Sequence, residues 1–143
     1  MQLKAVPTLL ALLALTACAS SFHLYPVSGP MMASHPVPIL HGSMRPPTPG
    51  NVSLELPDAE ICTGKWVVAP ATGIDSNLGP LWDELYGPSY FTAKVLGLPN
   101  HGQAQLTGNQ GTHLQLDFLF SLPGPWGIGV AQDDKGNVYK VVL

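Results

Sequence analysis

Charged residues are scarce in this sequence of 143 residues. They make up 10% of it, against ~25% in ordinary soluble domains. Lysine and arginine total six against nine aspartates and glutamates, so no basic patch is available to neutralise nucleic-acid phosphates. The sequence also lacks an apolar run of the ~20 residues that a membrane-spanning helix needs. These absences argue against nucleic acid as a partner and against a transmembrane helix.

The N-terminus has the parts of an export signal. An apolar run from Ala5 to Leu15 contains five leucines. It ends in Leu15-Thr16-Ala17-Cys18, which matches at every position the lipobox of bacterial lipoproteins. The resemblance implies that residues 1–17 are a removable signal peptide and that Cys18 carries acyl chains, such as palmitate, that anchor the protein in a membrane. Ordinary signal cleavage is the alternative, because Ala17-Cys18-Ala19 also fits that rule.

The residue after the lipobox indicates which membrane holds the anchor. Among Gram-negative lipoproteins an aspartate at this position usually retains the protein in the inner membrane. Ala19 stands there in this sequence. The resemblance therefore favours the outer membrane, with the protein facing the periplasm.

Cysteine is also scarce, because only Cys18 and Cys62 are present. With Cys18 lipidated, Cys62 has no partner for an intramolecular disulfide. A buried, inert thiol is the expected state of Cys62, and an intermolecular disulfide or a reactive thiol is the alternative. An enzyme would have to use Cys62 with His101 or His113 as its base. Since no acid, base and nucleophile cluster in the sequence, we expect a non-enzymatic protein.

Proline is concentrated in one segment. Seven of the fifteen prolines lie between Ala19 and Gly50, and each fixes φ and removes an amide donor. We therefore expect residues 18–50 to form a disordered or polyproline-like tether, part of which packs on the domain or the membrane surface through its apolar side chains. The histidines of this segment match no metal-binding spacing, so neither a metal nor another cofactor is expected; they are His23, His35 and His41.

The remaining residues, 51–143, alternate between apolar and polar in short runs, which predicts an all-β domain. The clearest run is His113–Leu122, whose five apolar side chains would share one face of a strand. Similar runs predict strands over residues 51–56, 66–69, 91–95 and 103–107. The apolar segment Val138–Leu143 is expected to be a last strand buried on both faces. The predicted fold is a small antiparallel β-sandwich or barrel of about six to seven strands.

Two turns and one helix complete this prediction. Gly108–Gly111 and Asp133–Asn137 are rich in Gly, Asn and Asp, which favour tight hairpins. The second of them lacks the ligand pattern of a calcium-binding loop. Pro80–Tyr86 predicts a short helix, because proline suits the first helical position and Gly87 can end it.

Five residues form the candidate binding surface. In Trp126–Ala131, alternation places Trp126, Ile128 and Val130 in the core, which leaves Gly127 and Gly129 as a flat strip. Another backbone or a flat ligand could approach this strip, although packing is the favoured explanation. Aromatic side chains that could stack on a sugar, or simply belong to the core, complete the set: Trp66, Trp82 and Tyr86.

Two short motifs carry a second resemblance. Trp82–Gly87 reads WDELYG and Gly136–Tyr139 reads GNVY. Together they resemble a group of small Gram-negative lipoproteins with a WDxxYG element and a closing GNVY strand. The resemblance covers roughly Trp66–Leu143 and implies fold and location, with no activity.

The expected function is that of an outer-membrane-anchored periplasmic lipoprotein. Such a protein would be a non-enzymatic structural or interaction module of the cell envelope, whose partner is an envelope protein or peptidoglycan. The alternative is a binding or inhibitor module for a glycan, peptidoglycan or wall-degrading enzyme. That alternative rests on analogy with small lipid-anchored barrels that inhibit lysozyme.

Overall fold

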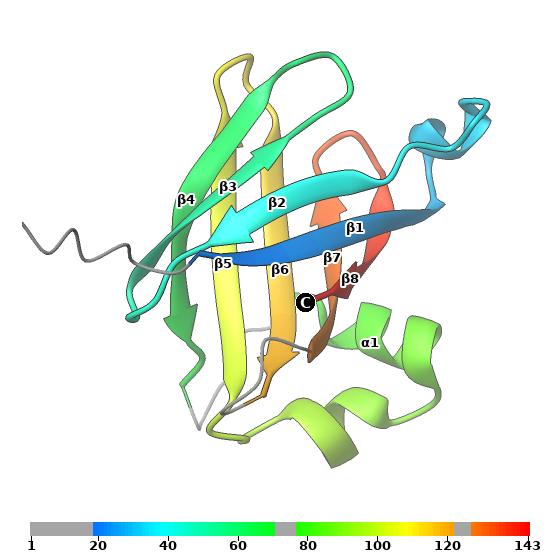
Figure 1. The fold of residues 1–143 in the computed structure, drawn as a ribbon. Coiled ribbons are helices and arrows are strands. Elements are labelled where there is room, and N and C mark those ends of the chain that lie inside the picture. Colours follow the sequence, from blue (N-terminus) through cyan, green and yellow to red (C-terminus); the bar gives the residue numbers. More distant parts are fainter. Residues whose placement is uncertain (1–18, 71–76, 122–126) are drawn as a thin grey trace, which may run out of the picture.

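The fold of this chain, in a computed structural model, is described for residues 19–70, 77–121 and 127–143. These residues form eight antiparallel strands, each hydrogen-bonded to the next along the sequence. The first strand also pairs with the last, so the sheet closes into a barrel (Figure 1). The strands are β1 (Ser20–Ser28), β2 (Leu40–Met44), β3 (Gly50–Glu55), β4 (Ile61–Val68), β5 (His101–Gly108), β6 (His113–Phe120), β7 (Gly127–Asp133) and β8 (Val138–Val142).

Three helical segments lie in the connections. The 3-10 helix η1 (Pro30–Ala33) follows β1, and the helix α1 (Gly79–Tyr86) and the π-helical η2 (Phe91–Val95) lie between β4 and β5. The prediction of a helix over Pro80–Tyr86 is confirmed. Helix α1 begins with proline in its first turn and ends at Gly87, whose φ of 122° favours glycine.

The alternating strand directions give the barrel two different ends. At one end, which we call the N-terminal end, β1 and β5 begin, β4 and β8 end, and a turn joins β2 to β3. The opposite end, the distal end, carries the connections of residues 29–39, 56–60, 109–112 and 134–137. These distal connections lie along the top and upper right of Figure 1.

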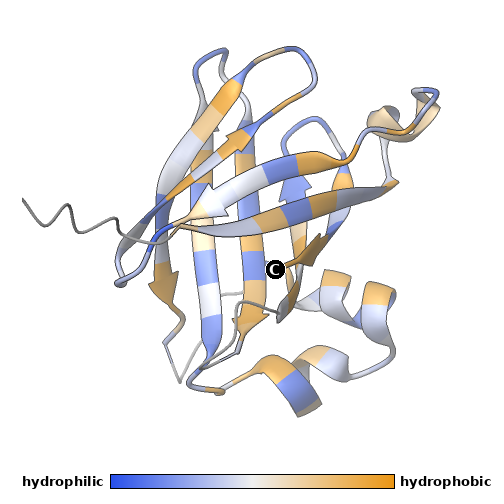
Figure 2. Ribbon diagram, in the orientation of Figure 1, coloured by the Kyte–Doolittle hydropathy of each residue, from blue (hydrophilic) through white to orange (hydrophobic). Residues whose placement is uncertain are grey.

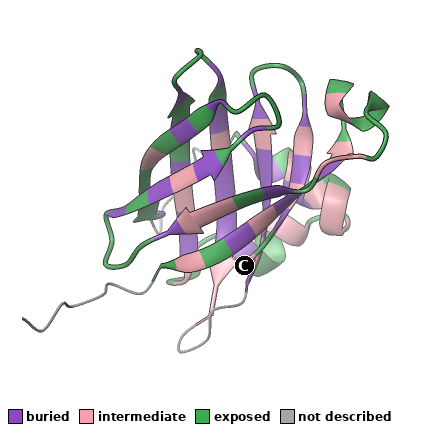
Figure 3. Cartoon of the chain, turned by 45° about the horizontal axis from the view of Figure 1, so that its top comes forward, coloured by how far each residue is buried: buried purple, intermediate pink, exposed green. Residues whose placement is uncertain are grey.

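The barrel interior is filled with apolar side chains. Hydropathy and burial alternate along the strands (Figures 2 and 3), because successive side chains point to opposite faces of a sheet. An eight-stranded barrel is just wide enough to be filled in this way. The buried interior residues include Phe22, Leu24, Leu54, Cys62, Leu106, Leu116, Phe118, Tyr139 and Val141.

A second apolar cluster covers part of the outer face of the barrel. Trp82 of α1 and Val95 of η2 are fully buried and pack with Val130 of β7. Asp83 Oδ1 accepts a hydrogen bond of 2.9 Å from Phe91 N, which ties α1 to η2. The helices therefore cover one side of the sheet.

The all-β prediction is confirmed, with eight strands among the described residues in place of the predicted six to seven. The prediction of a tether over residues 18–50 is wrong. Strands β1 and β2 lie inside that range and supply two of the eight barrel strands. Most of the prolines occupy positions that tolerate them. Pro30 opens η1, and the others outside β1 lie in the connections on either side of β2. Pro26 lies beside the register shift between β1 and β8.

Three local predictions are also corrected. Residues 91–95 form η2 rather than a strand. Strand β8 is buried on one face only, because Val142 is exposed. In β7 the inward face is the one that carries Gly129 and Ala131, opposite Phe118 and Leu116, while Ile128 packs with the outer cluster. Trp126 lies outside the described residues.

Candidate functional site at the distal end

The distal end contains Glu60, a buried carboxylate between β3 and β4. Its side chain is fully buried. It accepts hydrogen bonds from Thr112 Oγ1 at 2.6 Å, from Thr112 N at 3.0 Å and from Gln110 N at 3.0 Å. These hydrogen bonds lower the pKa of Glu60, and the bond from the Thr112 hydroxyl has the largest effect. Burial acts in the opposite direction and raises the pKa. Glu60 thereby fixes the β5–β6 turn to the β3–β4 turn.

A second carboxylate organises the β7–β8 turn. Asp133 accepts hydrogen bonds of 2.9 Å from Lys135 N, Asn137 N and Asn137 Nδ2. The Tyr139 hydroxyl donates a fourth bond to it from inside the barrel. Asn137 Oδ1 in turn accepts a bond of 2.7 Å from Met31 N of η1. The connections of the distal end are therefore linked to one another before any partner binds.

An open cleft of about 290 Å³ lies between these connections. Three elements line it, namely η1 with Met31, the β3–β4 turn with Pro57 and Asp58, and the β7–β8 turn with Lys135. A neighbouring groove of about 250 Å³ shares Leu56 and Pro57 with this cleft and continues to Ile39, His41 and Glu55. The two hollows together present apolar and polar groups on rigid loops, as binding sites do.

The rim of these hollows is acidic. Glu55, Asp58 and Asp134 are exposed there. Lys135, whose Nζ lies 3.9 Å from Glu60 Oε1, is the only lysine or arginine in the four distal connections, all of which are described. The surface potential at this end therefore favours basic groups.

The predicted binding surface is not assembled. Trp66 lies inside the barrel toward the N-terminal end, where its Nε1 donates a 3.0 Å hydrogen bond to Arg45 O. Trp82 belongs to α1 and packs on the other side of the sheet, in the cluster with Val95 and Val130. Gly127 and Gly129 are buried, and a Cβ at Gly129 would overlap the Phe118 side chain. No flat strip is therefore left for a ligand along this part of β7.

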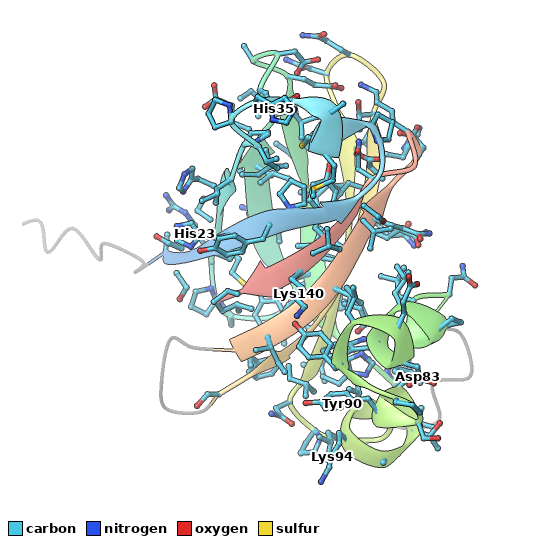
Figure 4. The ribbon with its side chains drawn as sticks, turned by 90° about the vertical axis from the view of Figure 1, so that its right-hand side faces the viewer. His23, His35, Asp83, Tyr90, Lys94 and Lys140 are labelled. Atoms are coloured by element: carbon cyan, nitrogen blue, oxygen red, sulfur yellow. The ribbon has the colours of Figure 1, made fainter. Side chains whose placement is uncertain are left out.

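Some of the predicted residues do meet one another. The Tyr86 hydroxyl donates a 2.9 Å hydrogen bond to Gly129 O, and the ring of Tyr86 lies 5.2 Å from that of Trp82. Lys140 Nζ lies 5.2 Å from the centre of the Tyr86 ring, and Figure 4 shows Lys140 beside the helices. These contacts hold α1 against the barrel. Cys18 lies outside the described residues.

The residues of the enzyme hypothesis lie on different sides of the barrel wall. Cys62 is buried in the interior. Its pKa is raised to about 11, mainly by burial and to a smaller extent by the negative charges of Glu60 and Asp58. His101 packs on the outer side against Phe91 and bonds Asp117, and His113 is exposed. A protonated interior thiol cannot reach either histidine, so this pairing lacks support.

Two findings concern metals and membranes. Among the residues described, no three or more His, Cys, Asp or Glu side chains gather closely enough to hold a metal ion. His23 and His41, which sequence spacing leaves apart, face each other across β1 and β2 with ring centres 4.7 Å apart. In the described part of the chain, no helix has the length and apolar character needed to span a membrane.

Sequence reasoning missed the polar network of the distal end. Asp133–Asn137 is recognisable as a turn, and an aspartate that accepts the N–H two residues on is typical of one. No local signal links Glu60 to Thr112, because the two are far apart in the sequence. Their contact depends on the pairing of β4 with β5, which sets Cys62 opposite Gly108 and so brings the two turns together.

Comparison with protein-family models found no match. Comparisons with curated proteins and with solved structures found none either. The resemblance to small Gram-negative lipoproteins therefore remains a prediction.

Proposed function

We propose that this protein is a lipid-anchored envelope lipoprotein that presents a rigid, non-enzymatic barrel to a partner in the periplasm. The observation that carries the proposal is the Leu15-Thr16-Ala17-Cys18 lipobox, which Ala19 alone separates from the start of β1 at Ser20. By the same resemblance the anchor belongs to the outer membrane. The partner is an envelope protein or peptidoglycan.

The filled interior supports a surface-based role. Large side chains such as Phe118 and Tyr139 occupy the barrel centre, so a small ligand cannot be carried there as in wider or emptier barrels. Binding would instead use the outside of the molecule. The distal end has ordered loops and two adjoining hollows, which makes it the best candidate surface.

The anchor is tested by intact mass measurement and membrane fractionation in a Gram-negative host. The wild-type chain is expected to carry a lipid-sized mass increment and to partition with the outer membrane, and Cys18→Ala is expected to lose both. A soluble wild-type product cleaved after Ala19 would refute the anchor.

The distal surface is tested by photo-crosslinking in the envelope. A crosslinker at Ile39, in the groove of the distal end, is expected to capture a defined partner. The matched control carries the crosslinker at Gln105, which is exposed on the outer face of β5. Equal products from both positions, or products from Gln105 alone, would refute the distal surface.

A binding or inhibitor role toward a wall-degrading enzyme is a second candidate, favoured by the acidic rim. Lysozyme-like enzymes act on an anionic wall and are commonly basic, so Glu55, Asp58 and Asp134 would attract them. Lysozyme and peptidoglycan pull-downs test this role. The variant Asp58→Asn/Asp134→Asn should reduce capture of the enzyme, whereas the control Glu84→Gln on α1 should retain it. No retention on either material would exclude this role.

A further inference from the structure

We propose that the N-terminal end of the barrel rests directly on the lipid surface, with Val67, Leu96 and Leu98 as its apolar contacts. This inference depends on the proposed lipidation of Cys18. Beyond the anchor, the inference specifies which end of the barrel faces the membrane. The distal end is then free to face a partner.

The length of the connection carries the argument. Only Ala19 separates Cys18 from Ser20, the first residue of β1. A fully extended residue spans ~3.3–3.6 Å, so the acylated cysteine would hold the start of β1 within roughly 10 Å of the membrane. Ser20 pairs with Met44 of β2, and β1 is bonded on its other side to β8. The anchor therefore acts on the rigid barrel, with no flexible tether in between.

The same end of the barrel exposes apolar side chains. Val67 and Val68 are the last two residues of β4, and β5 begins shortly after Leu98. The antiparallel order therefore places these residues and Leu96 at the end where β1 begins. Val67 is 44% exposed, and the other three are each 39% exposed. Branched apolar side chains at a membrane-proximal surface enter the headgroup boundary, as those of interfacial helices do.

The distribution of charge also favours the N-terminal end as the one that faces the membrane. Arg45 and Lys94 are exposed at the N-terminal end, and Figure 4 shows Lys94 at the extremity of the helical segment, away from the strands. Among the described residues of the helical connection and the β2–β3 turn, they balance Asp83 and Glu84 of α1. In the described distal connections, Lys135 is the only lysine or arginine beside three exposed carboxylates. An anionic lipid surface attracts lysine and arginine and repels an acidic rim, so the N-terminal end is the one that can approach it.

The orientation is tested with the full-length lipidated protein in vesicles of phosphatidylethanolamine and phosphatidylglycerol. An environment-sensitive fluorophore is attached through Leu98→Cys or, in a second protein, through Gln110→Cys at the distal end. Cys62 is buried and stays unlabelled, which the wild-type chain checks. Quenching by nitroxide-labelled lipids is then compared between the two probes.

The probe at residue 98 should be quenched at least about threefold more than the probe at residue 110, because an interfacial contact reaches ~5–10 Å into the headgroup region. A second variant, Leu96→Ser in the residue 98 probe protein, should weaken this quenching, whereas Ile61→Ser at the distal end should leave it unchanged. Equal quenching of the two probes, or stronger quenching at residue 110, would overturn the inference.

Failure of the orientation can be told apart from failure of the anchor. The mass of each labelled protein is measured before reconstitution. A missing lipid increment refutes the proposed anchor and this inference with it. A lipidated protein with unselective quenching refutes the orientation alone.

Discussion

The hydroxyl of Tyr139 lies 2.8 Å from Asp133 Oδ2 and donates a hydrogen bond to it. Tyr139 belongs to the filled interior, and Asp133 holds the β7–β8 turn through two backbone N–H groups. Burial, the hydrogen bond and the charge of Asp133 all raise the pKa of the Tyr139 hydroxyl, so it remains a donor. This one bond joins the apolar core to the polar network of the distal end.

Removing this hydroxyl should loosen the distal end without disturbing the fold. We expect Tyr139→Phe to lower the free energy of unfolding by about 1–2 kcal/mol, because Asp133 loses a buried donor. Urea denaturation measures the change. Tyr25→Phe is the matched control, since Tyr25 is exposed, and it should have no effect. Equal stability of wild type and Tyr139→Phe would show that the bond contributes nothing.

The stability of the protein should depend on the ionisation of Glu60. The pKa of Glu60 is lower in the folded protein than its ordinary value of 4.5. Its contribution is therefore present above pH 4.5 and is lost as the pH falls through the folded value. Glu60→Gln should lower the urea midpoint at pH 7, and the difference from wild type should shrink in acid. The control Glu55→Gln changes an exposed glutamate and should leave the urea midpoint unchanged both at pH 7 and in acid. Parallel pH profiles for wild type and Glu60→Gln would contradict this role.

The thiol of Cys62 should be inert in the folded protein. It is buried and its pKa is raised to about 11, so little thiolate is available at pH 8. Iodoacetamide at pH 8 should add no mass to the native wild-type protein, as it adds none at position 62 of the native Cys62→Ala control. In urea the wild-type thiol should be alkylated within the same time. Rapid alkylation of the native protein would mean that the interior opens to reagent.

Gly129 should tolerate no side chain. A Cβ at this position would meet the Asp117 carbonyl oxygen and the Phe118 side chain, and overpacking of this kind costs ~1–3 kcal/mol or more. We expect Gly129→Ala to destabilise the barrel by at least about 2 kcal/mol, measured by urea denaturation. Gln132→Ala on the same strand, a half-buried position, is the control and should cost less. A stable Gly129→Ala protein would show that β6 and β7 can move apart.

The parts of the fold that the sequence predicts are those governed by local patterns. His113–Phe120 alternates strongly enough to define β6, and Pro80 with Gly87 delimits α1. The apolar spacing of Phe91–Val95 fits both a strand and a helix. In the helical form, Phe91 N bonds Asp83 and Val95 packs in the outer cluster. That bond depends on how α1 already packs.

The remaining features depend on tertiary contacts. The inward face of β7 carries Gly129 and Ala131 because Phe118 and Tyr139 of neighbouring strands fill the space beside them. Local hydropathy assigns such a face to the outside. In and after β1, Pro26 and the prolines of the next connection obscure an alternation in which Phe22 and Leu24 point inward. Local sequence patterns cannot predict the site at the distal end either, because Glu60 and Thr112 meet only through strand register.

The pairing of β1 with β8 has a consequence for biogenesis. A nascent chain that has not yet supplied Val138–Val142 leaves β1 with β2 as its only neighbour, and β7 with an open edge. The barrel therefore cannot close until Val138–Val142 is available to pair with both β1 and β7. The proposed export requires a chain that is still unfolded, and this topology keeps the barrel open until β8 is delivered.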